Sequence, residues 1–499
     1  MKATPDQQAA IQTEGRPLLV DAGAGTGKTW VLVERFIHLL EQHPDWPLES
    51  IIAITFTNKA TREMRSRIRQ AVEERAEAAH PESHWQARRR SVDRLMVNTI
   101  HGLCAHILRE NAIAAGVDPR FQALDEVEAG LIKEEAINQT IAELVDQASP
   151  SLDLLVSLNV RDLKNEMAQL LNQRGTVHRI MESLPDSQTL LKVWAKGLEE
   201  MRWGMWQVEL RLDPNLEQAT RYFEDLPVMD PTDLLTPGVM LARDGGRPLQ
   251  AGDLASAIEH WQRISLRGGK RDNWGGAESF EEMKAMLKSL QVSAKKLAAA
   301  GCAATLDEQD KLAAADLQLW KDLWLRLEQR YNRLKEARQA LDFDDLEILT
   351  EALLYAHSPS ERLHAFLVGI RHLMVDEFQD TNQIQQNIVY ALAHPQDNGK
   401  LFVVGDAKQS IYRFRQAQVA VFNRTAQDIA SASGHPSIPL RRSFRTQADL
   451  VSALNALFAQ VFIPAGEDFA DYEARPGALE AQRPSPTRQE QAPAPVEVV

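Results

Sequence analysis

The 499-residue sequence contains only two cysteines, Cys104 and Cys302. Two thiols are too few for a disulfide framework or a four-thiolate metal cluster, so this usage is typical of the reducing cytoplasm. No uninterrupted apolar run approaches the ~18 residues that a membrane-spanning helix needs, and the first residues contain no apolar signal-peptide core. These absences predict a cytoplasmic protein without a membrane partner.

Positive charge is also scarce, since 56 Lys and Arg residues stand against 70 Asp and Glu residues and the net charge is −14. Binding to DNA is driven by basic residues that displace its counterions, so this balance alone argues against a nucleic-acid protein. The average conceals local basic clusters, which comprise Arg62, Arg65, Arg67, Arg69, Arg88 to Arg90, Lys408, Arg413, Arg415, Arg441, Arg442 and Arg445. Each cluster taken alone is better explained as a solvated helix face.

Apolar residues make up 44% of the sequence and charged residues 25%, the balance of a soluble globular protein, and the length suggests roughly two to four domains. Short apolar runs alternate with helical periodicity near the start of the chain, which is typical of a parallel sheet flanked by helices. Strands are expected at 17–21, 51–56, 95–99, 372–376, 401–405 and 437–440. From 118 to 340 Leu, Ala, Glu and Gln recur at helical spacing, which predicts a helical insertion. The Pro-rich stretch 481–495 is expected to be a loop or linker.

A glycine-rich turn joins the first expected strand to the first long helix. It comprises Ala22, Gly23, Ala24, Gly25, Thr26, Gly27, Lys28 and Thr29. Glycines let backbone amides turn toward phosphate oxygens, and the helix N-terminus adds the positive end of its dipole. In such a phosphate loop Lys28 lies on the β- and γ-phosphates and the Thr29 hydroxyl binds Mg²⁺. A turn without a ligand is the alternative, and the strand-to-helix context argues against it.

An acidic pair, Asp376 and Glu377, follows another expected strand. A carboxylate in that position can hold Mg²⁺, and its neighbour can polarise the water that attacks the γ-phosphate. Acidic pairs alone more often cap helices or face solvent, but in a chain with a phosphate loop this pair predicts ATP and Mg²⁺ as cofactors. We therefore assign Asp376 to the metal and Glu377 to the water.

Seven ordered motifs resemble those of the UvrD/Rep-like superfamily 1 DNA helicases. They comprise Gln7 with Ala10 and Ile11, Thr55 to Ala60, Thr99 to His101, Leu341 to Leu346, Val375 to Asn382, Val404 to Arg415 and Leu440 to Thr446. The resemblance implies a RecA-like α/β domain from 1–117 and 341–435, an all-α insertion at 118–340, and the start of a second RecA-like domain at 436–499. It also implies an ATP-dependent 3′–5′ helicase that binds single-stranded and duplex DNA.

The resemblance also places the remaining site residues. Gln7 reads the adenine, Phe444 covers it, and Arg445 reaches the γ-phosphate. Gln409 couples that phosphate to DNA, which makes Lys28, Glu377, Gln409 and Arg445 the catalytic set, and Arg35 helps to bind the nucleotide. The DNA-binding set is Phe56, Thr57, Asn58, Thr99, His101, Tyr412 and Phe414. Taken singly, Phe56 and Phe414 are equally well explained as core aromatics, and Gln7 and His101 as ordinary surface residues.

About 240 residues separate the second DNA motif, which ends at His101, from the acidic motif, which begins at Leu341, and an insertion of this length resembles that of the AddA and RecB helicase-nuclease subunits. This branch implies double-strand-break processing in recombinational repair, an AddB-like or RecC-like partner subunit, and a C-terminal nuclease in the intact parent. No further motor motif follows Arg445, so we expect a fragment with poor ATP turnover. The alternatives are a nucleotide- and DNA-binding fragment without turnover, and an ATPase without a DNA role; Tyr412 and Phe414 in the coupling motif argue against the latter.

Overall fold

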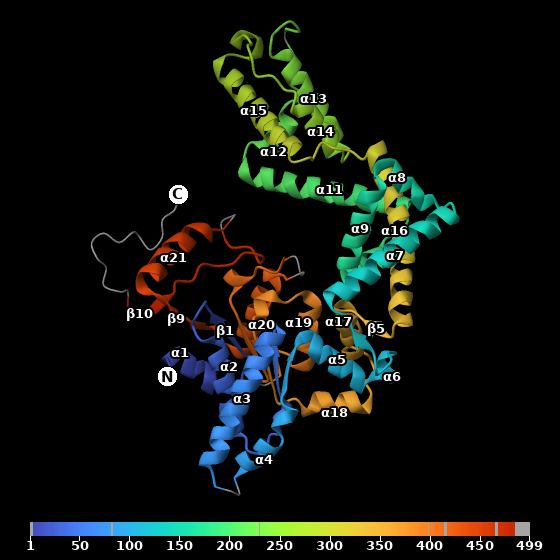
Figure 1. Cartoon of the computed structure of the whole chain (residues 1–499). Coiled ribbons are helices and arrows are strands. Elements are labelled where there is room, and N and C mark those ends of the chain that lie inside the picture. Colours follow the sequence, from blue (N-terminus) through green and yellow to red (C-terminus); the bar gives the residue numbers. More distant parts are fainter. Residues whose placement is uncertain are drawn as a thin grey trace, which may run out of the picture. The chain divides into compact units, whose positions relative to one another are not determined.

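The computed structural model describes residues 3–80, 83–228, 230–397, 399–413, 417–464 and 468–484. The chain divides into two compact units (Figure 1). The first comprises Met1–Ala136, Gln173–Gly175 and Tyr331–Val499, and the second Ile137–Asn172 and Thr176–Arg330. None of the helices in the described ranges has the length and apolar character needed to cross a bilayer.

A six-stranded parallel sheet forms the centre of the first unit. Its strands are β1 (Leu18–Ala22), β2 (Ile51–Thr55), β3 (Met96–Thr99), β6 (His372–Val375), β7 (Leu401–Gly405) and β8 (Ile438–Leu440). They lie in the order β3-β2-β6-β7-β1-β8, and every neighbouring pair is parallel. Each lies within one or two residues of an expected strand, so the predicted α/β class is confirmed.

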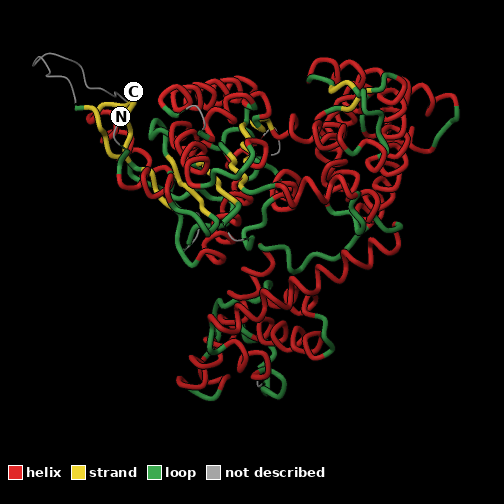
Figure 2. Tube along the Cα trace, turned by 90° about the horizontal axis from the view of Figure 1, so that it is seen from below, coloured by secondary structure: helices red, strands yellow, loops and turns green. Residues whose placement is uncertain are grey.

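Helices cover both faces of this sheet, and Figure 2 shows the strands running between helical layers. Alternate strand residues belong to different cores, as with Val20 on one face and Leu19 on the other, which explains why the strands read as continuous apolar runs. One face packs against α2 (Lys28–Gln42) and α3 (Asn58–Ala78). The other packs against α5 (Ile100–Glu110), α17 (Phe343–Leu354), α18 (Glu361–Gly369), α19 (Gln383–Leu392) and α20 (Val419–Ser433).

Two short parallel ladders were not anticipated. In one ladder, β4 (Gln122–Ala123) pairs with β5 (Ala340–Leu341). In the other, β9 (Arg442–Gln447) pairs with β10 (Glu480–Arg483). Helix α21 (Ala448–Val461) lies between β9 and β10 in the chain. Strand β9 is polar and lacks apolar alternation, so its sequence carries no strand signal. Residues 481–483 of the expected loop therefore belong to a strand, and 485–499 lie outside the described residues.

The described residues of the second unit form helices and loops without a strand. The helices of the insertion are α7 (Glu126–Asp146), α8 (Leu154–Ser157), α9 (Val160–Asn172), α10 (Arg174–Ser183), α11 (Ser187–Leu212), α12 (Leu216–Tyr222), α13 (Thr236–Gln250), α14 (Leu254–Trp261), α15 (Ala277–Ala299) and α16 (Glu308–Ala337). Trp206 and Trp261 stack in its core, with ring centroids 5.8 Å apart. The assignment of 436–499 to a second motor domain stays a prediction.

Candidate nucleotide and nucleic-acid site

The expected site residues follow the carboxyl ends of adjacent strands. Thr99 ends β3, Phe56 follows β2, Asp376 follows β6, Asp406 follows β7, and the loop Gly23–Gly27 follows β1. Because all these strands are parallel, their carboxyl ends lie at one edge of the sheet, where ligands of open α/β sheets bind. The fold therefore brings segments that are far apart in the sequence to one edge.

The phosphate loop is closely packed around its glycines. Gly25 and Gly27 have φ values of 73° and 88°, in the left-handed region that disfavours side chains. A Cβ on Gly23 would lie 2.5 Å from Cδ2 of Leu479, and one on Gly25 would lie 2.7 Å from Cβ of Arg445. The turn opens α2, whose first backbone N–H groups and dipole favour an anion. This backbone fits a polyphosphate.

Gln7 is buried against this loop. Its Nε2 donates to the Thr26 carbonyl over 2.9 Å, and its Oε1 accepts from the Thr4 backbone in a capping box that opens helix α1 (Pro5–Gln12). The Thr26 hydroxyl in turn donates to the Gly23 carbonyl over 2.8 Å. Gln7 thus supports the loop in this structure, and its contact with an adenine stays a prediction.

Lys28 lies at the centre of the polar site. Its Nζ is 2.6 Å from Oε2 of Glu377 and 3.5 Å from Oε1 of Gln409. Gln409 also donates to Asp406 over 2.7 Å. The fold therefore brings together Lys28, Glu377 and Gln409. Thr29, the next residue of α2, is half-buried.

Carboxyl groups are crowded at the end of β6. Burial raises the pKa of Asp376 to about 7, and the Glu377 carboxylate adds to this effect. Burial and Glu377 likewise raise the pKa of Asp380 to about 6. A cation would relieve this repulsion, and Mg²⁺ is usually bound through one or two carboxylates together with phosphates. The residues at this position therefore fit Mg²⁺.

Gln379 is a site residue that the motif comparison did not single out. Its Nε2 donates to Glu377 over 2.9 Å and to Asp380 over 3.2 Å, and its Oε1 accepts the Asp406 backbone N–H over 3.0 Å. The buried amide therefore joins the metal motif to the coupling motif. In the sequence, the position of Gln379 between Glu377 and Asp380 could have indicated a site residue. Its contact with Asp406 is seen only in the folded structure.

The segment after β8 passes over the phosphate loop. The Phe444 backbone N–H donates to the Gly25 carbonyl over 2.9 Å, and Ser443 is fully buried beside the same glycine. Arg445 has an exposed side chain whose Cβ lies next to Gly25. Phe444 and Arg445 thus lie beside the loop that they were expected to serve.

Arg35 does not offer its guanidinium to a nucleotide, which contradicts the expectation. It is fully buried, donates to the carbonyls of Ala10 and Thr13 over 2.8 Å each, and bonds His372 through Nε. Its guanidinium also lies 4.4 Å from the centre of the Phe402 ring. Arg35 therefore ties α1 to α2 and the sheet, a role that the spacing of basic residues cannot distinguish from ligand binding.

Two expected DNA-stacking residues meet at the sheet edge. The rings of Phe56 and Tyr412 lie 4.8 Å apart and are tilted by 39°, although they follow different strands. Phe56 precedes Thr57, which caps α3 by accepting the Ala60 N–H, and both Thr57 and Asn58 are exposed. Phe414 lies outside the described residues.

The second expected DNA motif caps α5 and contacts α17. Thr99 accepts the Gly102 N–H over 3.1 Å. The His101 ring stacks on Phe343 with centroids 4.3 Å apart, and its Nε2 lies 2.8 Å from Oε1 of Glu347. Phe343 and Glu347 were not predicted as site residues, because only the folded sheet brings the acidic motif beside Thr99 and His101.

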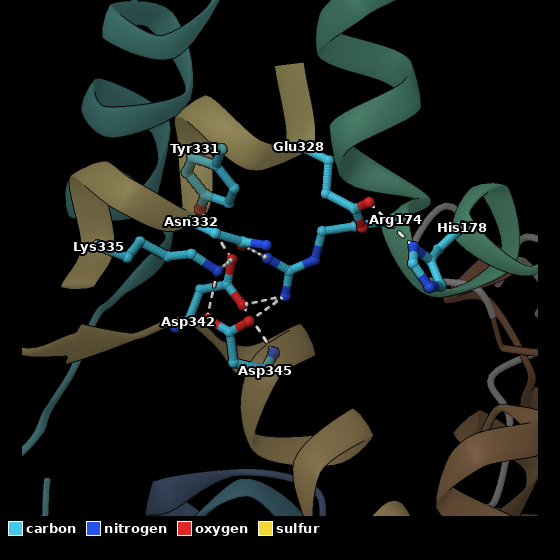
Figure 3. A network of polar contacts seen from close by, with 8 residues as sticks. All are labelled: Arg174, His178, Glu328, Tyr331, Asn332, Lys335, Asp342 and Asp345. Atoms are coloured by element: carbon cyan, nitrogen blue, oxygen red, sulfur yellow. Dashed lines mark hydrogen bonds and ion pairs between the residues drawn. The ribbon is translucent and has the colours of Figure 1, made fainter. Parts of the chain in front are cut away.

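The acidic motif also holds a buried ionic network (Figure 3). Arg174 lies 3.0 Å from Asp342 and 2.5 Å from Asp345, and Lys335 bonds both carboxylates. Burial alone would raise the pKa of Asp342, but Arg174 and Lys335 hold it well below its usual range. The two aspartates are therefore paired with basic side chains of the fold around α17.

Comparisons with known proteins agree with the motif series. A family model described as UvrD/REP helicase N-terminal domain matches residues 3–430. The chain is 28% identical to the AddA protein of Oceanobacillus iheyensis, which is named as a subunit of an ATP-dependent helicase/nuclease, over 92% of this chain and 39% of that protein. Proteins with the same name from Clostridium beijerinckii and Bacillus licheniformis are also 28% identical, over 95% and 94% of this chain and 40% of their own length. The predicted likeness to the AddA-like branch is confirmed, and the chain spans about two-fifths of these relatives.

Proposed function

The chain belongs to the UvrD/REP helicase family, and we propose that it forms the nucleotide-binding part of an ATP-driven DNA translocase with 3′–5′ polarity. Its proposed role is the processing of double-strand breaks for recombinational repair.

The nucleotide half of this proposal rests on the phosphate loop and the end of β6. The loop amides and Lys28 would bind the phosphates, while Thr29 and Asp376 would hold Mg²⁺. Bound Mg²⁺ would neutralise charge that develops on the transferred phosphoryl group. Glu377 would take the proton from the attacking water, because it is the carboxylate beside Lys28. Arg445 would add a cation near the same phosphates.

The DNA half rests on side chains that suit single strands without reading their sequence. Phe56 and Tyr412 offer aromatic faces on which bases can stack. Thr57, Asn58, Thr99 and His101 lie at or near the N-termini of two helices, where hydroxyl, amide, ring and backbone N–H groups suit phosphates.

One observation carries the proposal: the segment from Gln409 to Tyr412 contacts both the nucleotide side and the DNA side of the site. Gln409 lies 3.5 Å from Lys28, and Tyr412, three positions later, contacts Phe56. A change at Lys28 on phosphate binding can thus be transmitted to a DNA-facing ring through one short segment. A nucleotide-binding protein without a DNA role has no need for this arrangement.

The relatives are named as helicase/nuclease subunits, and this name supports placement in a multi-subunit repair enzyme. We propose an AddB-like or RecC-like partner subunit on that basis. The relatives are bacterial, and a bacterial enzyme acting on chromosomal DNA works in the cytoplasm, the compartment that we propose here.

The proposal is tested by measuring whether the two ligands influence each other. Affinity of the 499-residue chain for a fluorescent ATP analogue with Mg²⁺ is measured with and without an oligothymidylate, together with ATP hydrolysis. We expect DNA to change nucleotide affinity and nucleotide to change DNA affinity by the same factor, as linkage requires. Equal nucleotide affinities with and without bound DNA would overturn the proposed coupling. Polarity is tested by streptavidin displacement, which 3′–5′ movement accelerates at a 5′-biotinylated end.

A further inference from the structure

A buried carboxylate outside the proposed nucleotide and DNA contacts gathers three side-chain donors. Oε1 of Glu347 lies 2.8 Å from Nε2 of His101 and accepts from Nε2 of Gln385 over 2.6 Å, and its Oε2 accepts from Nδ2 of Asn382 over 3.1 Å. Burial alone would raise the pKa of Glu347, but the bonds from His101, Gln385 and Asn382 lower it below its usual value. The carboxylate is therefore ionised and fully paired at neutral pH.

The first of these donors is an expected DNA contact. Phe343 and Glu347 are four residues apart on α17, so they project from one helix face and hold His101 by ring stacking and by a hydrogen bond. An ionised carboxylate at Nε2 requires a proton on that nitrogen. A phosphate oxygen is also an acceptor, so Nδ1 can bind it only when that nitrogen carries a proton as well. Glu347 and Phe343 thus fix the orientation of the His101 ring.

The other two donors belong to the turn that follows the metal motif. Asn382 and Gln385 form the capping box of α19, in which the Asn382 side chain accepts the Gln385 N–H over 2.8 Å. Asn382 directly follows Thr381, whose carbonyl accepts the Gln418 N–H over 3.1 Å from the segment after Tyr412. Glu347 therefore links His101 to the junction between the metal motif and the coupling segment.

We propose that Glu347 is a positioning residue that orients His101 toward a DNA phosphate and ties that contact to the α19 capping box beside the metal motif. This inference rests on the proposed function. Displacement of His101 by DNA would act on Asn382 through a shared, buried carboxylate, which gives the nucleotide site a second connection to DNA besides Gln409 and Tyr412.

The chain offers a matched control on the same helix. Glu351 accepts from Nδ2 of Asn387 over 2.6 Å, so it also joins α17 to α19, but its described hydrogen bonds do not include one to His101. Glu347→Gln and Glu351→Gln make the same chemical change at positions one helical turn apart. For Glu347→Gln we expect oligothymidylate affinity to fall by about tenfold, because a charge-assisted bond is lost, while nucleotide affinity without DNA stays within about twofold. For Glu351→Gln both affinities should stay within about twofold.

A double-mutant cycle separates positioning through His101 from general support of the fold. His101→Ala is combined with Glu347→Gln, and we expect the double variant to bind DNA as weakly as His101→Ala alone, because Glu347 acts through that ring. Additive losses, or an equal loss in Glu351→Gln, would overturn the inference. Glu347→Asp, which keeps the charge but withdraws the carboxylate, replaces the glutamine variant if the latter does not fold. If the wild-type chain binds no DNA, the proposed function itself fails; if it binds DNA and Glu347→Gln is unchanged, only this inference fails.

Discussion

Nζ of Lys28 lies 2.6 Å from Oε2 of Glu377, so the lysine expected on the phosphates is paired with the carboxylate expected to activate water. A bound triphosphate would compete with Glu377 for this ammonium group. When the triphosphate binds Lys28, it would displace the Glu377 carboxylate, which could then accept a proton from water.

The first prediction concerns this exchange. Glu377→Gln should raise nucleotide affinity by about three- to tenfold, because Lys28 loses an ionic competitor, and should lower ATP hydrolysis by at least about a hundredfold, because the general base is lost. Fluorescence titration and phosphate-release assays measure the two effects. Lys28→Ala is the comparison and should weaken nucleotide binding. Weaker nucleotide binding by Glu377→Gln would show that the carboxylate supports the ligand instead of competing with it.

The second prediction concerns the aromatic pair. Phe56→Ala should weaken oligothymidylate binding by about 1–3 kcal/mol, the value of one base stacked on an aromatic ring. Tyr412→Phe keeps the ring and should leave the affinity nearly unchanged. Fluorescence anisotropy at several salt concentrations checks the cause, because loss of stacking leaves the slope of log Kd against log salt unchanged. A reduced slope would assign the effect to lost phosphate contacts.

The third prediction concerns pH and stability. Burial, followed by the Asp342 carboxylate, raises the pKa of Asp344 to about 6. The folded chain therefore binds more protons than the unfolded chain between pH ~4 and ~6, and this group lowers stability as the pH rises through that window. Asp344→Asn should add roughly 1–2 kcal/mol to the free energy of unfolding above pH 6 and less near pH 4. Urea denaturation across this range measures it.

Asp45→Asn is the matched control for this measurement, because Asp45 is exposed and the chemical change is the same. Its effect on stability should be small and should vary little between pH 4 and 7. A pH-independent gain in Asp344→Asn would mean that the raised pKa is not the source of the difference.

The fourth prediction separates fold from ligand binding at Arg35. Arg35→Met should lower the free energy of unfolding by about 2–4 kcal/mol, because the carbonyls of Ala10 and Thr13 lose a buried donor. Nucleotide affinity, measured well below the melting temperature, should change by less than about threefold because the side chain faces the core. A large loss of affinity with unchanged stability would restore the original assignment of Arg35 to the nucleotide.

Sequence patterns placed most elements around the sheet edge because these signals are local. Apolar runs such as 372–376 mark strands buried on both faces, and glycines such as Gly27 mark a turn that side chains would strain. Strand β9 was missed because Arg442–Gln447 is polar and its pairing partner β10 lies far along the chain. Apolar periodicity in a sequence reflects the burial of side chains. A polar strand that is held chiefly by backbone pairing with another strand shows no such periodicity.

The order of the motifs likewise predicted phosphate and Mg²⁺ binding at the site, because a phosphate loop or an acidic pair at a strand end can be recognised from a few consecutive residues. The tertiary structure alone decided which side chains touch. Lys28 and Glu377 are 349 positions apart, and Arg35 and His372 are 337 apart, yet one pair lies in the site and the other in the core. The sequence signals for a helix or a buried strand lie in residues that are close together in the chain. The partner of a charged side chain depends instead on which distant segments the fold brings together. For this reason Arg35 was misassigned and Glu347 was not predicted.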